Sequence, residues 1–229
     1  MAVHLVAPGV HMVSHRGANM YLLDDDGRLV LVDTGFPGSE GVVLDAIAAL
    51  GHASADLGDI ILTHAHYDHV GSAAALVAAT GARTWMHPVD APLAESGRGS
   101  RPMKPAPGLL RHLMFRLFAK PGRTTAPVKI DELVEEGATI PLAGGLRVIH
   151  VPGHCAGQIA LGQPATGILF AADTCMNILG LGDPIGFEDR AIGRASQRKL
   201  AALDFTIACF GHGQPLHDAA ARFRARWGG

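Results

Sequence analysis

Three histidines and an aspartate stand close together in the first third of the chain, as His64, His66, Asp68 and His69. They directly follow the apolar run 60–62, which predicts a buried strand. Imidazole nitrogens and carboxylate oxygens are ligands that zinc and similar divalent ions take in proteins, and the chain has no cysteine cluster to compete for that role. The simpler alternative is four unrelated surface residues, but side chains of this chemistry rarely gather so closely by chance. The segment therefore predicts metal-dependent chemistry.

Further candidate ligands stand in the second half of the chain, each at the end of an apolar run. His154 lies among glycines that allow the backbone to turn its imidazole inward. Asp173 ends the run 168–172, and His212 stands between two glycines after the run 207–210. A lone histidine after a strand is more often a turn or packing residue. Together, the three cases repeat one pattern, an apolar strand followed by a histidine or an aspartate. They predict the remaining ligands of the metal site.

This pattern resembles the metallo-β-lactamase fold superfamily, whose signature is His-x-His-x-Asp-His followed by an isolated histidine, an aspartate and a last histidine. Every part of the signature is present here and in order. The resemblance implies an α/β fold with four αββα layers, in which two mostly antiparallel sheets lie between outer helices. It also implies how the ligands are shared. One metal would be held by His64, His66 and His154, the other by Asp68, His69 and His212, with Asp173 bridging both.

The same resemblance implies a metal-dependent hydrolase, with a ligand set similar to that of the glyoxalase II branch. Its cofactors would be two divalent ions, zinc in the first place and iron or manganese as alternatives. Two such ions about 3.5 to 4 Å apart can share one water and turn it into a hydroxide nucleophile. We therefore expect attack on an ester, thioester or lactone bond. Asp68 would both ligate a metal and carry a proton to the leaving group.

Two other functions remain open on the same scaffold. A mononuclear iron site supports sulfur dioxygenation in one branch of the family, and metal content with oxygen uptake would distinguish it from hydrolysis. A nucleic-acid phosphodiesterase would use a basic segment to hold phosphates, which salt-dependent binding would reveal. The overall acidity of the chain makes nucleic acid the less favoured partner, so we expect a small-molecule substrate.

Several residues near the predicted ligands are candidates for supporting roles. Asp33 could fix the tautomer of a ligand histidine through a hydrogen bond, or it could simply form a turn. Cys155 and Cys175 neighbour predicted ligands, but free cysteines are commonly small buried hydrophobes, and we predict that neither is a ligand. Substrate contacts are unassigned, and the candidates for them are Tyr67, Asn177, Arg111 and Arg116.

Hydrophobic periodicity predicts the elements that would position these residues. Strands are expected at 3–6, 10–13, 20–23, 29–32, 60–62, 84–86, 139–142, 146–151, 159–161, 168–171 and 205–210, with a hairpin turn at 24–27. Helices are expected at 39–50, 72–80, 189–203 and 218–227, the second capped by Ser72 and ended by Gly81. The first four strands read as an antiparallel sheet. Because each sheet must bury one apolar face, this order independently predicts two facing sheets with helices outside.

Residues 96–127 differ in composition from the rest and are predicted to form a basic insertion. Seven of the 19 basic residues lie here and no acidic residue does. Residues 109–119 place apolar side chains on one face of a helix and Arg111, His112 and Arg116 on others. This helix could cap the core with its charges in water, or serve as a lid or a docking surface, including an interface between two copies. A basic rim would also favour an anionic substrate such as a coenzyme A or glutathione thioester.

Composition limits the class of protein. With 229 residues and 48% hydrophobic content, the chain can bury one substantial core, and we predict a single domain over 1–229 with the insertion at 96–127. No apolar run is long enough to span a bilayer, and the first residues lack a secretion signal. The three cysteines are few and widely spaced, which argues against a disulfide framework. These features predict a soluble, cytoplasmic protein.

Overall fold

The computed structural model describes residues 3–119 and 122–228. Its first sheet has seven strands in the order β1-β2-β3-β4-β5-β6-β8, and its second has six in the order β17-β16-β12-β11-β10-β9. The first contains β1 (Val3–Ala7), β2 (Val10–His15), β3 (Ala18–Asp25), β4 (Arg28–Val32), β5 (Leu57–Ile61), β6 (Arg83–Met86) and β8 (Glu132–Leu133). The second contains β9 (Thr139–Ile140), β10 (Leu146–His150), β11 (Ile159–Gln163), β12 (Ile168–Phe170), β16 (Ile207–Cys209) and β17 (Leu216–His217).

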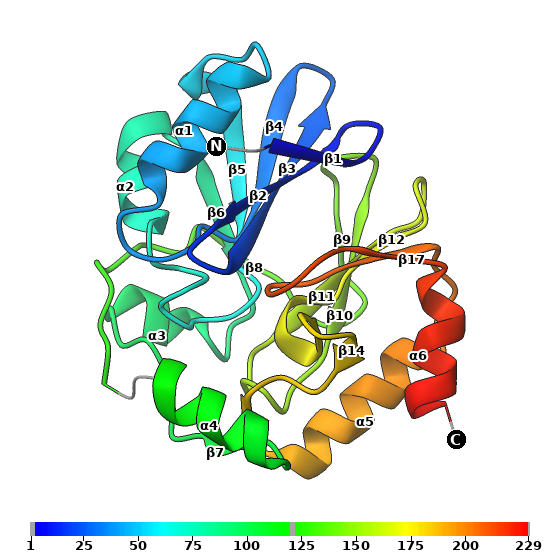
Figure 1. Ribbon diagram of the computed structural model, residues 1–229. Helices are drawn as coiled ribbons and strands as arrows, with labels where there is room; N and C mark the ends of the chain where they lie inside the picture. Colours follow the sequence, from blue (N-terminus) through cyan, green and yellow to red (C-terminus); the bar gives the residue numbers. More distant parts are fainter. Residues whose placement is uncertain (1–2, 120–121, 229) are drawn as a thin grey trace.

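Helices cover the outer faces of both sheets. In Figure 1, α1 (Glu40–Ala49) and α2 (Ala73–Thr80) lie along the first sheet, and α5 (Arg190–Ala201) and α6 (Ala219–Trp227) lie along the second. The short α3 (Ala91–Glu95) and the longer α4 (Leu109–Phe118) lie at the lower left of Figure 1. Two small ribbons complete the structure, β7 (Lys104–Pro105) with β15 (Gly186–Phe187) and β13 (Met176–Asn177) with β14 (Leu181–Gly182). The predicted four-layer αββα arrangement is confirmed.

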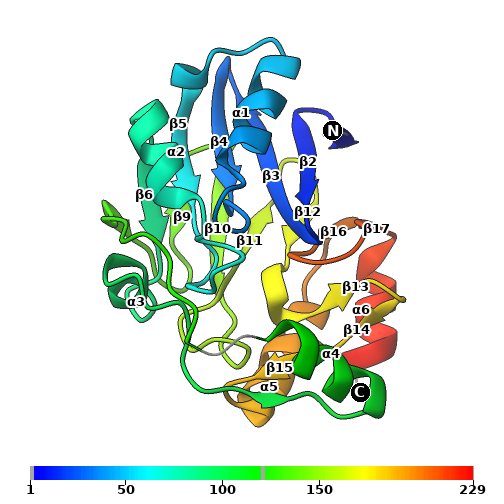
Figure 2. The ribbon, with the colours of Figure 1, turned by 60° about the vertical axis from the view of Figure 1, so that its left-hand side comes forward.

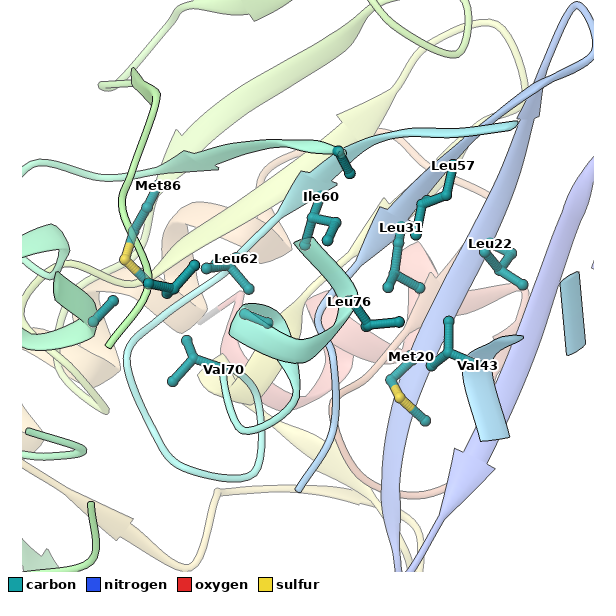
Figure 3. Packing of buried hydrophobic residues seen from close by; sticks show 14 of the residues in the cluster. Met20, Leu22, Leu31, Val43, Leu57, Ile60, Leu62, Val70, Leu76 and Met86 are labelled. Atoms are coloured by element: carbon teal, nitrogen blue, oxygen red, sulfur yellow. The ribbon is translucent and has the colours of Figure 1, made fainter. Parts of the chain in front are cut away.

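Side chains on successive strand residues enter different hydrophobic clusters. On β3, Met20 and Leu22 pack toward the outer helices, whereas Tyr21 and Leu23 pack between the sheets. Figure 3 shows the outer cluster of the first sheet, where Leu31 and its neighbours from β3 and β5 meet side chains of α1 and α2. A third cluster joins the second sheet to α5 and α6. Because strand side chains alternate between faces, both faces of each sheet are apolar and buried, which gives four layers.

Strand direction differs between the two halves of the first sheet. The pairs from β1 to β4 are antiparallel, as the sequence predicts. The pairs β4 with β5, β5 with β6 and β6 with β8 are parallel, because helices or long connections carry the chain back to the same end each time. The β5 strand also begins earlier than expected, since the polar Asp59 is buried there and accepts hydrogen bonds from Arg83 and Trp85.

The parallel strands deliver several carboxyl ends to one edge of the molecule. In the first sheet β4 and β5 run together, and in the second β12 runs parallel to β16. The β10 strand has the same direction as β12, because both are antiparallel to β11. The predicted ligands follow β5, β10, β12 and β16, so this topology brings their loops to a common edge.

The insertion contains the predicted amphipathic helix, α4. Its apolar face does not cover the hydrophobic core. No residue of Leu109–Phe118 is buried. Arg111, Met114 and Phe115 are its half-buried side chains, while the leucines are largely exposed. The interpretation of this helix as a core cap with charges in water is therefore wrong. The assignment of 1–229 to one domain with an insertion stays a prediction, and Lys120 of the basic segment lies outside the described residues.

Candidate metal centre

Loops at the carboxyl ends of the strands bring all seven predicted ligands together. The loop after β5 carries His64, His66, Asp68 and His69. The loop after β10 carries His154, the 3-10 turn Ala172–Thr174 after β12 carries Asp173, and the loop after β16 carries His212. Their donor atoms fall into overlapping groups that could each hold a metal ion.

The first group contains three buried imidazoles and one buried thiol. His66 Nδ1 lies 3.2 Å from His64 Nε2 and 3.0 Å from His154 Nε2. Three ring nitrogens that converge so closely can all reach one cation. Cys155 belongs to the same group, since its Sγ lies 3.1 Å from His66 Nε2. The sequence prediction does not include this cysteine as a ligand, and the thiol contacts the side of the His66 ring opposite to Nδ1.

The second group consists of Asp68, His69 and His212, with ligand atoms within 4.8 Å of one another. His212 Nε2 lies 3.4 Å from Asp68 Oδ2. His69 is fully buried, whereas Asp68 and His212 are partly exposed at the opening of the centre. This group combines one carboxylate with two imidazoles, which suits a divalent transition-metal ion.

Asp173 lies between the two groups. Its Oδ2 is 3.5 Å from His154 Nε2 and 3.3 Å from His212 Nε2, while its Oδ1 is 3.6 Å from His69 Nε2. Asp173 Oδ1 and His69 Nε2 are buried without a hydrogen-bond partner among the described residues. Leaving a buried polar atom unpaired costs about 1–3 kcal/mol, so these two atoms fit a bound cation better than an empty site. A side chain at Gly211 would collide with both residues.

One carboxylate orients two of the candidate ligands. Asp33 Oδ2 accepts a hydrogen bond from His69 Nδ1 at 2.8 Å, which leaves His69 Nε2 free to face the centre. Thr63 donates its hydroxyl to the same oxygen at 2.8 Å and lies 3.0 Å from His64 Nδ1. Because its proton is used on Asp33, the Thr63 oxygen accepts from His64, whose Nε2 is then also free. The proposed tautomer-fixing role of Asp33 agrees with this geometry.

Backbone carbonyls orient two other rings. His154 Nδ1 donates to the carbonyl oxygen of Gly186 at 2.8 Å, and His212 Nδ1 donates to that of Gly17 at 2.7 Å. In both rings this fixes the proton on Nδ1 and turns Nε2 toward the centre. Gly17 lies in the turn between β2 and β3 of the first sheet and His212 in the loop after β16 of the second, so the contact also links the two halves of the molecule.

The electrostatics differ between the groups. Burial lowers the pKa of His64, His66 and His154, that of His66 to about 3 with a further contribution from neighbouring His154. These rings are therefore neutral and keep lone pairs for a cation. Burial also opposes charge on His69, but Asp33 and Asp173 outweigh it and raise its pKa to about 9.

Two ionised carboxylates lie in and beside the second group. Burial raises the pKa of Asp173, yet the nearby His212 and His69 hold it well below its usual range. The pKa of Asp68 is likewise lowered despite burial, chiefly by the hydrogen bond with His212. Both acids are therefore ionised at neutral pH, and their charges favour a cation between them.

Sequence reasoning missed Asp90, a fully buried carboxylate that joins the two halves of the first group. Its Oδ2 accepts from the backbone N–H of Ala65 at 3.0 Å, between two candidate ligand histidines, and its Oδ1 accepts from that of Gly157 at 3.0 Å, in the His154 loop. Arg101 from the insertion neutralises it through a 2.6 Å contact. Asp90 follows β6 as the other site residues follow their strands, so the pattern of a strand followed by a polar residue could have found it.

A second missed set anchors the loop of His212. Asn19 Nδ2 donates to the carbonyl oxygens of Phe210 and Gly213, at 3.0 and 2.6 Å. The Tyr21 hydroxyl donates to the Phe210 carbonyl at 2.8 Å and accepts from its N–H at 3.0 Å. Asn19 stands just before the apolar run 20–23 and Tyr21 within it, where no spacing distinguishes them from turn or core positions.

The candidates for substrate contacts lie around the opening but are held by protein groups. Tyr67 donates its hydroxyl to the carbonyl of Phe118 at 3.1 Å, with Arg123 over its ring. The Asn177 amide donates to the Gln214 carbonyl at 2.8 Å, and Arg111 donates to that of Asp183 at 3.3 Å. Arg116 is exposed on α4. Their role toward a substrate stays a prediction.

Comparison with known proteins agrees with this geometry. Residues 14–212 match the family model of the metallo-β-lactamase superfamily. The probable metallo-hydrolase YflN of Bacillus subtilis is 27% identical, and the match covers 92% of this chain and 86% of the relative. A hydroxyacylglutathione hydrolase of Jannaschia sp. is 34% identical over 72% of this chain, which spans only 52% of that relative's length.

Solved structures show the same fold. A metallo-β-lactamase mutant from Cronobacter sakazakii superposes with a TM-score of 0.77 at 24% identity, covering 99% of this chain and 93% of its own. The β-lactamase BJP-1 of Bradyrhizobium japonicum superposes with a TM-score of 0.73 at 22% identity, covering 100% and 91%. The chain belongs to the metallo-β-lactamase superfamily and is one of its metal-dependent hydrolases.

Proposed function

We propose that the protein is a binuclear metal-dependent hydrolase that cleaves an ester, thioester or lactone bond. The observation that carries this proposal is the position of Asp173, whose two oxygens face histidines of both groups. A carboxylate in that position can bridge two cations, with His64, His66 and His154 on one and Asp68, His69 and His212 on the other. Zinc fits the donor set first, and iron or manganese fits it as well.

The residues divide the work of the reaction. When bound, the two ions would supply an activated water and polarise the carbonyl oxygen of the substrate. The chain's part is to fix the imidazole tautomers through Asp33, Gly186 and Gly17, so that each free nitrogen faces inward. Asp68 is partly exposed and lies beside His212, a position from which its Oδ2 can carry a proton to the leaving group.

A thioester is the substrate class to test first. Relatives from Jannaschia, Aeromonas and Methylobacterium carry the name hydroxyacylglutathione hydrolase. Exposed basic residues of the insertion, such as Arg116 and Arg123, would favour an anionic substrate. We also propose that the protein works in the reducing cytoplasm, since Cys155, Cys175 and Cys209 are free thiols.

The deciding experiment combines elemental analysis with a substrate panel of thioesters, lactones, β-lactams and phosphodiesters. Two zinc ions per chain and turnover of a thioester or lactone are expected. One iron per chain with oxygen uptake would instead establish a dioxygenase, and cleavage confined to phosphodiesters would establish a phosphodiesterase. Either of these results overturns the proposal.

A further inference from the structure

Most of the large apolar side chains exposed on the described surface gather in one place. On α4, Leu109, Leu110, Leu113, Leu117 and Phe118 are between 51% and 88% exposed. In the turn between β13 and β14, Ile178 and Leu179 are 47% and 82% exposed. Scattered exposed leucines are normal, but five large apolar side chains exposed on one short helix indicate an interaction site. We call these seven residues the apolar patch.

The two segments of the patch lie side by side. Arg111 of α4 donates to the carbonyl of Asp183, directly after β14. Figure 2 shows α4 next to the β13 and β14 ribbon. The patch also borders the metal centre, because Phe118 accepts a hydrogen bond from Tyr67 and Asn177 donates its N–H to the carbonyl of His212. Any partner that binds the patch would therefore lie next to the opening of the metal centre.

The surroundings of the patch are basic. Arg98, Lys104, Arg116 and Arg123 are exposed, and residues 96–127 contain no acidic residue. A helix with outward leucines among basic residues has the chemistry that binds the surface of an anionic membrane, where apolar side chains enter the acyl boundary and the cations meet lipid phosphates. A second copy fits less well, because a twofold contact of this patch with itself would bring like charges together.

We propose that the apolar patch docks the protein onto anionic phospholipid surfaces, with the opening of the metal centre facing the lipid. The docking is peripheral: within residues 3–119 and 122–228, no helix has the length and hydropathy required to cross a bilayer. The proposal concerns location and stands independently of which bond the enzyme cleaves.

Vesicle co-sedimentation of the metal-loaded protein tests the proposal. Vesicles of equal parts phosphatidylcholine and phosphatidylserine should bind the protein, and pure phosphatidylcholine should bind it much less. The double variant L113Q/L117Q should lose about tenfold or more in affinity, and R116Q about fivefold. The control L5Q replaces a leucine on β1 that is even more exposed and lies far from α4 in sequence, and it should bind like the unmodified protein.

Failure of the fold is distinguishable from failure of docking. Leu113 and Leu117 are about half exposed, so L113Q/L117Q should keep its metal content and thermal unfolding temperature. As an independent readout, fluorescence emission of L113W should shift to shorter wavelength when the mixed vesicles are added.

Three results would overturn the proposal. They are equal binding of L5Q and L113Q/L117Q, no emission shift of L113W, or a dimer that L113Q/L117Q converts to monomer while neither form binds vesicles. The last result would assign the patch to a second copy of the chain.

Discussion

At the scale of single residues, the centre depends on hydrogen bonds that hold each imidazole by its other nitrogen. Asp33 is the strongest example, because one buried carboxylate orients His69 directly and His64 through Thr63. Its φ of 60° lies in the left-handed region, which costs a non-glycine residue about 1 kcal/mol or more. The chain keeps this costly conformation where it directs a carboxylate at two candidate ligands.

Replacing Asp33 by asparagine should weaken metal binding. The asparagine side chain has nearly the same shape as aspartate but carries no charge. Its NH2 group would face the Thr63 hydroxyl and the His69 N–H, which now donate to the carboxylate. We expect a loss of about 10–100-fold in affinity for the more weakly held metal, measured by competition with a chromophoric chelator. Asp45→Asn, at an exposed position of α1, is the matched control and should bind normally. Unchanged affinity in Asp33→Asn would show that the hydrogen bonds are unimportant for the ligands.

Asp68→Asn tests the proton transfer to the leaving group. At saturating metal, we expect kcat to fall by about 10²–10⁴-fold, because the amide cannot carry a proton. A substrate whose leaving group needs no proton should recover much of the rate. Metal content must be measured alongside, since Asp68 is also a candidate ligand. If the variant keeps two metals and its turnover is unchanged, Asp68 has no role in proton transfer.

At the scale of elements, the strands and the outer helices follow from apolar periodicity, and their ends follow from polar residues and glycines. Gly81 ends α2 in the left-handed conformation, as predicted. Ser72 precedes the helix, yet its hydroxyl lies 2.8 Å from both the Phe36 carbonyl and the Glu40 carboxylate and does not cap α2, because these acceptors before and at the start of α1 take its hydrogen. The orientation of α4 was not predictable, since periodicity shows that a helix has an apolar face but not whether the fold covers that face.

The contact between Asp90 and Arg101 shows how an insertion can support the centre. Asp90 is fully buried, whereas Arg101 is partly exposed and also contacts Glu188, so Asp90→Asn should lower the free energy of unfolding by about 1–3 kcal/mol, the cost of losing a hydrogen bond to a charged group. Chemical denaturation at a fixed metal concentration measures this. Lys129→Gln breaks an exposed ion pair with Asp131 and should leave the denaturation midpoint unchanged. Equal midpoints for both variants would mean that the buried pair does not stabilise the fold.

At the scale of the whole molecule, the seven candidate ligands could be predicted from the sequence because each follows a strand in a recurring pattern. Asn19 and Tyr21 could not be placed in the same way, since their partners are backbone groups far away in the chain. Such contacts exist only after both sheets have formed and faced each other. The centre is therefore a property of the assembled sandwich, whose three hydrophobic clusters hold the loops at one edge.

The three cysteines report on the integrity of this sandwich. Cys209 lies in the cluster between the sheets, Cys175 in the cluster under α5 and α6, and Cys155 beside the first ligand group. All are buried, and burial raises the pKa of each thiol. The thiolate is the reactive form, so each thiol stays protonated in the folded protein at a pH that ionises an exposed cysteine.

We therefore expect iodoacetamide to label none of the three cysteines in the folded protein, even when the pH is raised from 7 to about 9, where a free thiol with a pKa near 8.5 is mostly ionised. In denaturant all three should be labelled, and mass spectrometry identifies each site. Because the cysteines lie in different parts of the molecule, labelling at intermediate denaturant also shows which part opens first. Labelling of Cys209 in the folded protein at the rate of a free thiol would mean that the two sheets separate readily, and the ligand loops they carry could not then stay in place.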